Sequence, residues 1–186
     1  MKVPAARAGH RRDQILTEAR RLFRQRGFHG VGIDEIGTAV GITGPGIYRH
    51  FASKEDLLTS ALLEGAEQLW TERRHADDDE ADLDALVHDH AAWAVENVDV
   101  IDLWNREARS LPGPARLQQR RIQRRYVEAW VDALLLERPG MPEGQARAMV
   151  HAAIGLIHSV AHYDSMLDPE VLRTLLAEMA LGALRV

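Results

Sequence analysis

The stretch from Gly32 to Phe51, GIDEIGTAVGITGPGIYRHF, predicts two short helices joined by a tight turn. Asp34 and Glu35 fall in the first turn of the first helix, where negative charge suits the helix dipole. Gly41 is expected to end that helix, because glycine adopts the left-handed C-cap conformation without steric cost. Thr43 is expected to supply a hydroxyl N-cap for the second helix.

Apolar residues in this stretch can hold the two helices together. Ile33, Ile36 and Val40 recur at helical spacing and give the first helix one apolar face. Ile47 and Phe51 lie four residues apart and can pack the second helix against the first. A helix, a short glycine-bearing turn and a second helix form the helix-turn-helix pattern, which is typical of DNA-binding domains.

The residues after the turn carry hydrogen-bond donors. Pro45 falls in the first turn of the second helix, where a missing N–H is tolerated. Tyr48, Arg49 and His50 follow consecutively on that helix, and their side chains can all donate to phosphate oxygens. Lys54 comes next, in the capped start of another helix. These side chains predict an interface for nucleic-acid phosphates.

Residues 11–58 resemble the DNA-binding domain of TetR-family transcriptional regulators. The matching segments are LFRQRGF at 22–28, IDEI at 33–36, GIT at 41–43, IYRHF at 47–51 and SKEDLL at 53–58. The resemblance covers about a quarter of the chain. It implies a DNA-binding regulator that is not an enzyme.

The resemblance also implies roles for single residues. Contacts with phosphates are expected from Thr43, Tyr48, His50 and Lys54, and an approach to the bases from Gly44, Pro45, Gly46 and Arg49. The family usually has Ser or Thr where this chain has Gly32, and a basic or polar residue where it has Gly44-Pro45-Gly46. Specificity is therefore expected to depend on Arg49, on backbone approach at the glycines and on DNA shape.

The charge is distributed unevenly along the chain. The net charge is −5, but residues 1–56 hold ten Lys and Arg against six Asp and Glu, a net charge of +4. The remaining residues therefore carry −9. A basic head on an acidic body suits a phosphate-binding module attached to another domain, although a chance imbalance gives the same numbers.

Composition limits the class of protein. At 46% hydrophobic residues the chain can bury a core, and the absence of Cys excludes disulfides and thiolate chemistry. The N-terminus lacks the apolar core of a secretory signal. The longest apolar-rich run, residues 148–161, is shorter than the about 20 residues that a membrane span needs. We expect a soluble, cytoplasmic protein without a membrane partner.

Hydrophobic periodicity predicts an all-α fold of about nine helices. The expected ranges are 11–26, 33–40, 43–51, 53–74, 82–97, 98–109, 115–138, 143–165 and 169–186. We expect a flexible tail over 1–10, a three-helix helix-turn-helix domain over 11–56, and a ligand-binding and dimerisation domain over 57–186.

The last two helices carry more apolar surface than one small body can cover. A symmetric dimer, in which both pairs form a four-helix bundle, is the simplest way to bury it. Such a homodimer would place two recognition helices in successive major grooves, about 34 Å apart, and would read an inverted repeat.

Aromatic residues on the body helices have two interpretations. Trp93, Trp104, Tyr126 and Trp130 fall on three helices, and with His158 they can line a ligand pocket of the kind that the resemblance implies. Ordinary core packing explains them as well. The arginines at 116–125 form either a solvated face or a contact for an anionic effector such as an acyl-CoA.

The nine histidines raise a competing hypothesis. His151, His158 and His162 share one stripe of a predicted helix, which suggests a helical metal-binding protein or enzyme. The glutamate of a zinc-protease motif is missing, so a buried or pocket-lining histidine fits better. The acidic run 77–80 does not match a calcium-binding loop and reads as solvated. No catalytic motif stands out, and no cofactor or metal is expected.

The pattern as a whole indicates a homodimeric repressor that binds an inverted-repeat operator. We expect a small apolar or amphipathic molecule to bind the body and release the DNA. Such a molecule must bind the two states of the protein with different affinities.

Overall fold

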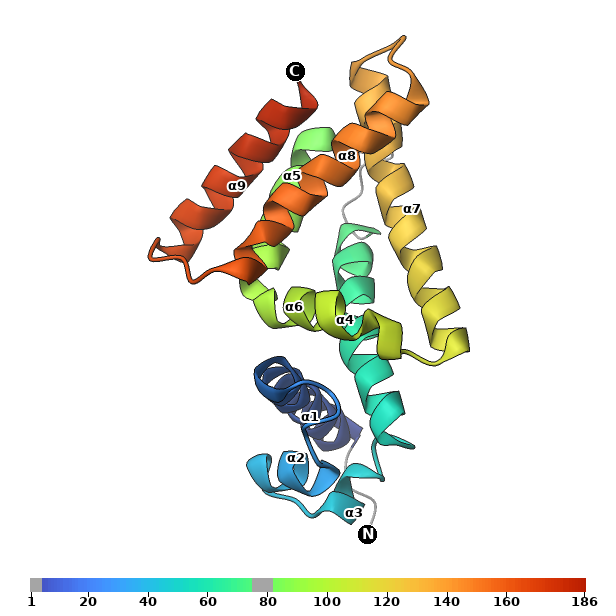
Figure 1. Ribbon diagram of the computed structural model, residues 1–186, viewed down its shortest axis with the longest axis vertical. Coiled ribbons are helices and arrows are strands. Elements are labelled where there is room, and N and C mark those ends of the chain that lie inside the picture. The colour runs from blue at the N-terminus through green and yellow to red at the C-terminus, as the bar shows by residue number, and fades with distance from the viewer. Residues whose placement is uncertain (1–4, 75–81) are drawn as a thin grey trace. The chain divides into compact units, whose positions relative to one another are not determined.

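The computed structural model describes residues 5–74 and 82–186, and in these ranges it contains nine α-helices and two 3-10 helices. Figure 1 follows the chain through these elements. Their bounds are α1 Ala5–Arg26, α2 Ile33–Ala39, α3 Gly44–Ile47, α4 Lys54–Arg74, α5 Leu83–Glu96, α6 Val98–Glu107, η1 Ala108–Ser110, α7 Gly113–Glu137, α8 Glu143–His158, η2 Ser159–His162 and α9 Pro169–Leu184. The predicted all-α fold is confirmed. The acidic run 77–80 lies outside the described residues.

The chain folds as two compact units. Unit 1 consists of Met1–Gly65 and Asp102–Leu117, and unit 2 of Ala66–Ile101 and Gln118–Val186. The predicted helix-turn-helix domain, residues 11–56, falls within unit 1. The functional boundary expected at residue 57 stays a prediction.

Glycines define the ends of the first two helices. Gly27 has φ +72 and follows α1, where its N–H donates to the Phe23 carbonyl at 2.8 Å. Gly32 is the extended N-cap of α2, with φ −90 and ψ 151. Gly41 has φ +71, so the predicted left-handed glycine after α2 is confirmed.

The core of unit 1 joins the helix-turn-helix to distant residues. Ile36, Ile47 and Phe51 are almost fully buried, as their spacing predicted. The rest of this core is Ile15, Leu16, Ala19, Leu22, Phe23, Phe28, Val31, Leu57, Leu58, Ala61, Leu62, Leu103, Leu111 and Ala115. The last three come from α6, the loop after η1 and the start of α7. They bring residues 102–117 into the unit that contains the N-terminal helices.

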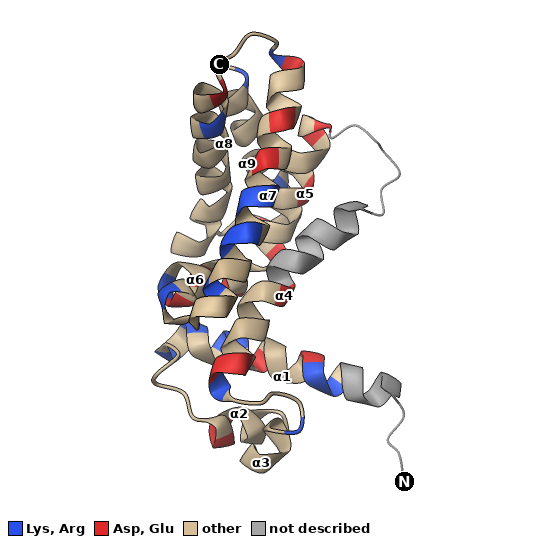
Figure 2. Cartoon of the chain, turned by 90° about the vertical axis from the view of Figure 1, so that its right-hand side faces the viewer, with Lys and Arg blue, Asp and Glu red and all other residues tan. Residues whose placement is uncertain are grey.

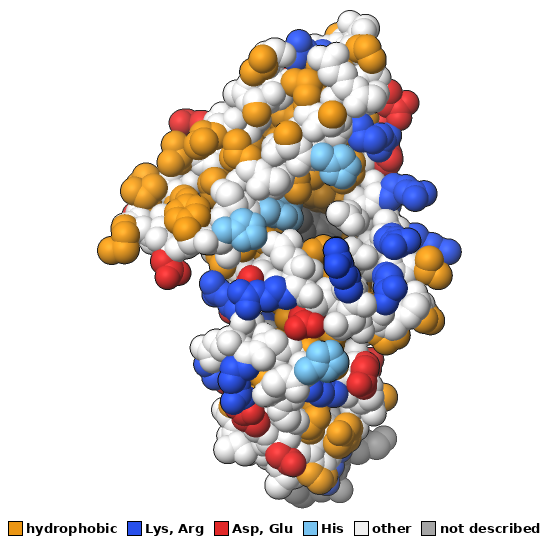
Figure 3. Space-filling model, viewed as in Figure 1, with side chains coloured by type: hydrophobic (Ala, Val, Ile, Leu, Met, Phe, Trp, Pro, Cys, Tyr) orange, Lys and Arg blue, Asp and Glu red, His pale blue; other side chains and the backbone are white. Residues whose placement is uncertain are grey.

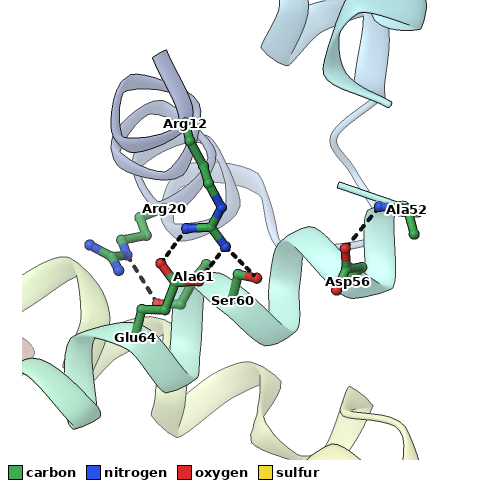
Figure 4. Close-up of polar contacts among 7 residues, drawn as sticks. All are labelled: Arg12, Arg20, Ala52, Asp56, Ser60, Ala61 and Glu64. Carbon is green, nitrogen blue, oxygen red and sulfur yellow. Dashed lines mark hydrogen bonds and ion pairs between the residues drawn. The ribbon is translucent and has the colours of Figure 1, made fainter. Parts of the chain in front are cut away.

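Polar contacts fix α1 against the first half of α4. The Arg12 guanidinium pairs with the Glu64 carboxylate and donates to Ser60 Oγ at 3.3 Å, and Arg20 Nε donates to the Ala61 carbonyl at 3.0 Å (Figure 4). At the start of α4, Ser53 Oγ accepts the Asp56 N–H at 3.1 Å. The predicted helix cap is thereby confirmed.

The carboxylates of Asp102 and Glu107 attach residues 102–117 to the C-terminal end of α1 and to the turn that follows it. Asp102 is buried, and its carboxylate lies 3.7 Å from Arg24 Nε and accepts from Arg106 Nε at 3.0 Å. Glu107 Oε1 accepts the Phe28 N–H at 2.9 Å, in the turn between α1 and α2. Glu107 Oε2 accepts from the Ser110 hydroxyl at 3.0 Å.

Unit 2 packs α9 against both α5 and α8. Asp82 caps α5 and Asp168 caps α9, each by accepting an N–H two residues further on, and Pro169 opens α9 as predicted. The core contains Trp130, Leu86, Val87, Val150, Ile157 and Leu176, among others.

Two predicted helix ends need correction. Helix α1 begins at Ala5, where a flexible tail was expected to His10; Ala5, Ala6 and Ala8 favour helix formation. Helix α8 ends at His158 and continues as η2 to His162, whereas one helix was expected to Ser165. The Ser159 N–H approaches the Ile157 and Leu156 carbonyls, which tightens the last turn into a 3-10 form.

Candidate nucleic-acid interface and aromatic cluster

The turn between α2 and α3 requires close backbone contact. The Ile42 N–H donates to the Gly37 carbonyl at 2.8 Å. A Cβ on Gly37 would lie 2.9 Å from the Ile42 carbonyl oxygen, and one on Gly44 would lie on the Asp34 carboxylate. At Gly37 only glycine lets α3 approach α2 this closely, because the obstructing atoms belong to the backbone, whereas the Asp34 side chain beside Gly44 can rotate.

The second helix of the motif is shorter than expected. Helix α3 ends at Ile47, Tyr48 is its C-cap, and Arg49 and His50 lie in the following turn rather than on the helix. Two glycines and a proline in four residues explain the short helix, because these residues have the lowest helix propensities. The predicted N-cap position of Thr43 is confirmed, but its hydroxyl makes no capping hydrogen bond within the described residues.

The predicted interface residues lie around this short helix. Tyr48 is 54% exposed. The side chains of Thr43, Pro45 and Arg49 are also exposed, those of His50 and Lys54 are half-buried with Gly46, and Gly44 is buried. Lys54 Nζ lies 4.4 Å from the centroid of the Phe28 ring, which places the ammonium over an aromatic face. Among the predicted contact residues, the Tyr48 phenol and the Arg49 guanidinium are therefore exposed and can reach DNA.

Most arginines of α1 have partners inside unit 1. Arg11 contacts Val40, Arg12 contacts Glu64, Arg20 contacts Ala61, Arg21 contacts Glu18, Arg24 contacts Asp102 and Arg26 contacts Glu35. These cations help to hold the unit together. The predicted basic head therefore offers fewer cations for phosphates than its composition indicated. Lys2 lies outside the described residues, as does the side chain of Arg7.

Unit 2 contains an aromatic cluster, which we define as His90, Trp93, Tyr126, Trp130 and His158. His90 is 3% exposed, and its two ring nitrogens lie 3.0 Å from Tyr126 Oη and 3.0 Å from His158 Nε2. Its ring centroid lies 5.0 to 5.9 Å from those of the other four rings. One imidazole thus joins α5, α7 and the end of α8.

Four of the five predicted ligand-site residues meet in this cluster. Trp104 does not belong to it, because Trp104 packs against the core of unit 1. His90 was not among the residues predicted to line the ligand site. Its spacing from Val87, Ala91 and Ala94, which are all buried on one face of α5, was the signal that could have found it.

The aromatic cluster has two unsatisfied donors. Within the described residues, the indole Nε1 atoms of Trp93 and Trp130 are buried and have no hydrogen-bond partner. Leaving a buried donor unpaired costs on the order of 1–3 kcal/mol. Both indoles lie beside His90, so the protein maintains two such costly groups within one cluster.

Burial keeps both histidines of the cluster neutral. Burial, with a smaller effect of His158, lowers the pKa of His90 well below its usual value. Burial, with a smaller effect of His162, lowers the pKa of His158 to about 4. Near neutral pH the pair therefore shares one proton along its Nε2–Nε2 contact and carries no charge.

The structure does not assemble the proposed histidine metal site. His151 and His162 are exposed, and His158 faces His90 instead. Within the described residues, the only group of three metal-binding side chains is Asp82, Asp84 and Glu137. Arg185 pairs with two of these carboxylates, those of Asp84 and Glu137.

Two surfaces of unit 2 are distinctive. Basic residues recur along α7 (Figure 2), and the side chains of Arg120, Arg121 and Arg124 are exposed. Hydrophobic side chains gather over α9 and the segment before it (Figure 3). The exposed members of this apolar face are Tyr163, Met166, Leu167, Val171, Leu175 and Met179.

A sequence model described as "Bacterial regulatory proteins, tetR family" matches residues 15–61. The HTH-type transcriptional activator FasR of Mycolicibacterium smegmatis is 38% identical over 66 residues, which are 36% of this chain and 30% of FasR. The HTH-type transcriptional repressor KstR2 of Mycobacterium tuberculosis is 27% identical over 158 residues, 77% of this chain and 72% of KstR2.

Solved structures share the fold at low identity. The structure of KstR2, described as a ketosteroid transcriptional regulator, superposes with a TM-score of 0.73 at 21% identity and covers 97% of this chain and 95% of that chain. AibR in complex with isovaleryl coenzyme A and operator DNA gives 0.75 at 20% identity, over 91% of this chain and 97% of AibR.

The helix-turn-helix of unit 1 and the helical unit 2 define a DNA-binding transcriptional regulator. Residues 15–61, which match the tetR model, give the chain the DNA-binding domain of the TetR family of regulators. Members of this family are transcription factors rather than enzymes, which agrees with the expectation from the sequence. Within the described residues, none of the helices is long and apolar enough to cross a membrane.

Proposed function

We propose that this regulator is a repressor that binds an inverted-repeat operator as a homodimer and leaves it when a small apolar or amphipathic molecule binds unit 2. The observation that carries this proposal is the exposed pair Tyr48 and Arg49, directly after α3 in a helix-turn-helix with a fully buried core. KstR2, the relative matched over most of its length, is described as a repressor.

The proposed DNA contacts follow from chemistry and exposure. Phosphate oxygens can accept hydrogen bonds from the hydroxyls of Thr43 and Tyr48. They can also accept from the ammonium of Lys54 and the imidazole of His50. Arg49 suits the bidentate contact with guanine that guanidinium groups make in the major groove. Pro45 and Gly46 present little side chain, so the backbone of α3 can approach the bases closely. Gly44 is buried, with the Asp34 carboxylate beside it.

The apolar face of α9 supports the proposed homodimer. Val171, Leu175 and Met179 repeat every four residues on α9 and are 53%, 41% and 51% exposed. On α8, Ala152 and Gly155 are exposed and small enough for close helix packing. A two-fold axis along these helices would bury both surfaces in a four-helix bundle and would present two copies of Arg49 to successive major grooves.

The aromatic cluster supports a small-molecule effector in unit 2. Its rings provide an apolar surface. An effector can supply the hydrogen-bond acceptors that its two unpaired indole N–H groups lack. The structure of AibR contains isovaleryl coenzyme A. An acyl-CoA is therefore one candidate for this chain, with the exposed arginines of α7 as contacts for its phosphates.

A pair of tyrosine variants tests the DNA-binding assignment. Tyr48 and Tyr163 are 54% and 52% exposed, and each can be replaced by Phe to remove only the hydroxyl. In a fluorescence anisotropy titration of duplex DNA, Tyr48→Phe is expected to weaken binding on the order of fivefold, because one phosphate hydrogen bond is lost. Tyr163→Phe is the control and should bind as the wild type does. Equal affinity of all three proteins would refute the role of Tyr48.

A further inference from the structure

The aromatic cluster contains two hydrogen-bond donors that lack an acceptor among the described residues. His90 uses both of its ring nitrogens, one with Tyr126 Oη and one with His158 Nε2. The two indole N–H groups, on Trp93 and Trp130, have no partner among the described residues. An indole nitrogen can only donate, so a molecule that satisfies these groups must bring a hydrogen-bond acceptor.

The charge of that acceptor follows from the side chains around it. The aromatic cluster consists of two indoles, a phenol and two imidazoles, and holds no lysine or arginine. Burial keeps both imidazoles neutral, so no cation is available to balance a buried anion. A carboxylate here would lose its water without gaining a counter-charge, which is strongly unfavourable.

The outer members of the aromatic cluster reach the surface of unit 2. Trp130 and His90 are buried, whereas Trp93, Tyr126 and His158 are half-buried and form its outer part. His158 is the last residue of α8, next to the 3-10 turn η2. A molecule that binds from the surface therefore meets the half-buried rings before the buried indole of Trp130.

We propose that the aromatic cluster recognises an effector through an uncharged carbonyl, as in a ketone, ester or thioester, which accepts a hydrogen bond from the indoles of Trp93 and Trp130. This inference rests on the proposed function, because it specifies the effector that unit 2 binds. It excludes free fatty acids and other carboxylates as the preferred class.

A matched set of eight-carbon probes tests the class of ligand. The probes are 2-octanone, octanoate and octylammonium, added to the full-length protein labelled with nitrogen-15. The chain has four tryptophans, so its indole N–H signals can be followed individually and assigned with Trp→Phe variants. 2-Octanone is expected to move the Trp93 and Trp130 signals downfield, as a new hydrogen bond does, and to leave that of Trp104 in place.

Trp→Phe variants test the donors, since Phe keeps a ring but removes the N–H. Trp93→Phe and Trp130→Phe are each expected to weaken 2-octanone binding on the order of fivefold. Trp104→Phe, in the core of unit 1, is the control and should leave the affinity unchanged. Equal affinity of all three variants, no movement of the Trp93 and Trp130 signals, or tighter binding of octanoate or octylammonium than of 2-octanone would each overturn the inference.

DNA binding of the same samples separates this inference from the proposed function. A protein that binds DNA but shows no ketone contact at Trp93 and Trp130 overturns only the class of effector. A wild-type protein that binds no DNA overturns the proposed function, whatever the probes show.

Discussion

The Nε2 atoms of His90 and His158 lie 3.0 Å apart, which requires one imidazole to donate its proton and the other to accept it. If His90 donates to His158, its Nδ1 must accept from the Tyr126 hydroxyl; in the other tautomer both directions reverse. Protonation of both imidazoles would place two N–H groups against each other and break this contact. The contact between α5 and the end of α8 therefore depends on the protonation of this pair.

Stability is expected to fall at acidic pH because of these two histidines. In the unfolded chain both have pKa values near 6.5, whereas burial lowers the pKa of His90 well below that value and that of His158 to about 4. The unfolded state therefore binds protons first. The stabilisation is complete above pH 6.5 and is lost as the pH falls towards 4, by up to about 1.4 kcal/mol per pH unit for each histidine.

Urea unfolding at pH 7, 6 and 5 measures this loss. His158→Asn is expected to reduce the pH dependence, because one of the two titrations is removed. His151→Asn changes an exposed histidine on the same helix and should leave the dependence as in the wild type. If the unfolding free energy depended on pH equally in all three proteins, the titration assigned to His90 and His158 would be contradicted.

The close approach at Gly37 predicts a sensitive position. A Cβ there would meet the backbone around Ile42 at 2.9 Å, so Gly37→Ala is expected to destabilise unit 1 by about 1–3 kcal/mol and to weaken DNA binding. Gly32→Ser is the contrasting change. Nothing lies within 4 Å of a Cβ on Gly32, and an extended N-cap gains a few tenths of a kcal/mol from a serine hydroxyl. Thermal unfolding measures both, and a neutral Gly37→Ala would contradict the packing of the turn.

Glu107 predicts a test of how residues 102–117 attach to the α1–α2 turn. Glu107→Ala removes the acceptor of the Phe28 N–H and is expected to cost about 1–2 kcal/mol. Glu107→Gln keeps a carbonyl oxygen for Phe28 and should cost less. Amide hydrogen exchange at Phe28 reports the bond directly: it should accelerate in the Ala variant more than in the Gln variant. Unchanged exchange in both would show that the bond is unimportant.

The apolar face of α9 predicts the oligomeric state. Leu175→Glu places a charge in the proposed interface and is expected to convert the dimer to the monomer mass of 20.8 kDa. Leu136→Glu is the control, because Leu136 is an exposed leucine on α7. Sedimentation equilibrium distinguishes the two masses. A Leu175→Glu protein that remains dimeric would place the interface elsewhere.

Local signals allowed much of unit 1 to be predicted. Gly32, Gly41 and Ser53 mark helix ends through their own backbone or side-chain chemistry, and the apolar spacing identified Ile36 and Ile47 as core residues. The predicted length of α3 was wrong, because the prediction gave more weight to the helical pattern through Tyr48 and His50 than to the low helix propensity of the glycines in α3. The DNA-contact roles of these residues stay predictions.

Contacts between distant parts of the chain were out of reach. Residues 102–117 join unit 1 through Leu103 and through Glu107, whose partner Phe28 lies 79 residues away. His90 and His158 are 68 residues apart. Periodicity shows that such residues face inwards, but not which partner each one meets. The aromatic cluster was therefore predicted as a set of rings without the histidine that joins them.

Selection of binding sites from a random pool of duplex DNA with the purified wild-type protein tests the central claim most directly. We predict recovery of an inverted repeat with half-sites about one helical turn, 34 Å, apart, and a changed base preference in Arg49→Ala. Recovery of no common motif, even at low salt where phosphate contacts are strongest, would contradict the assignment of a sequence-specific dimeric regulator.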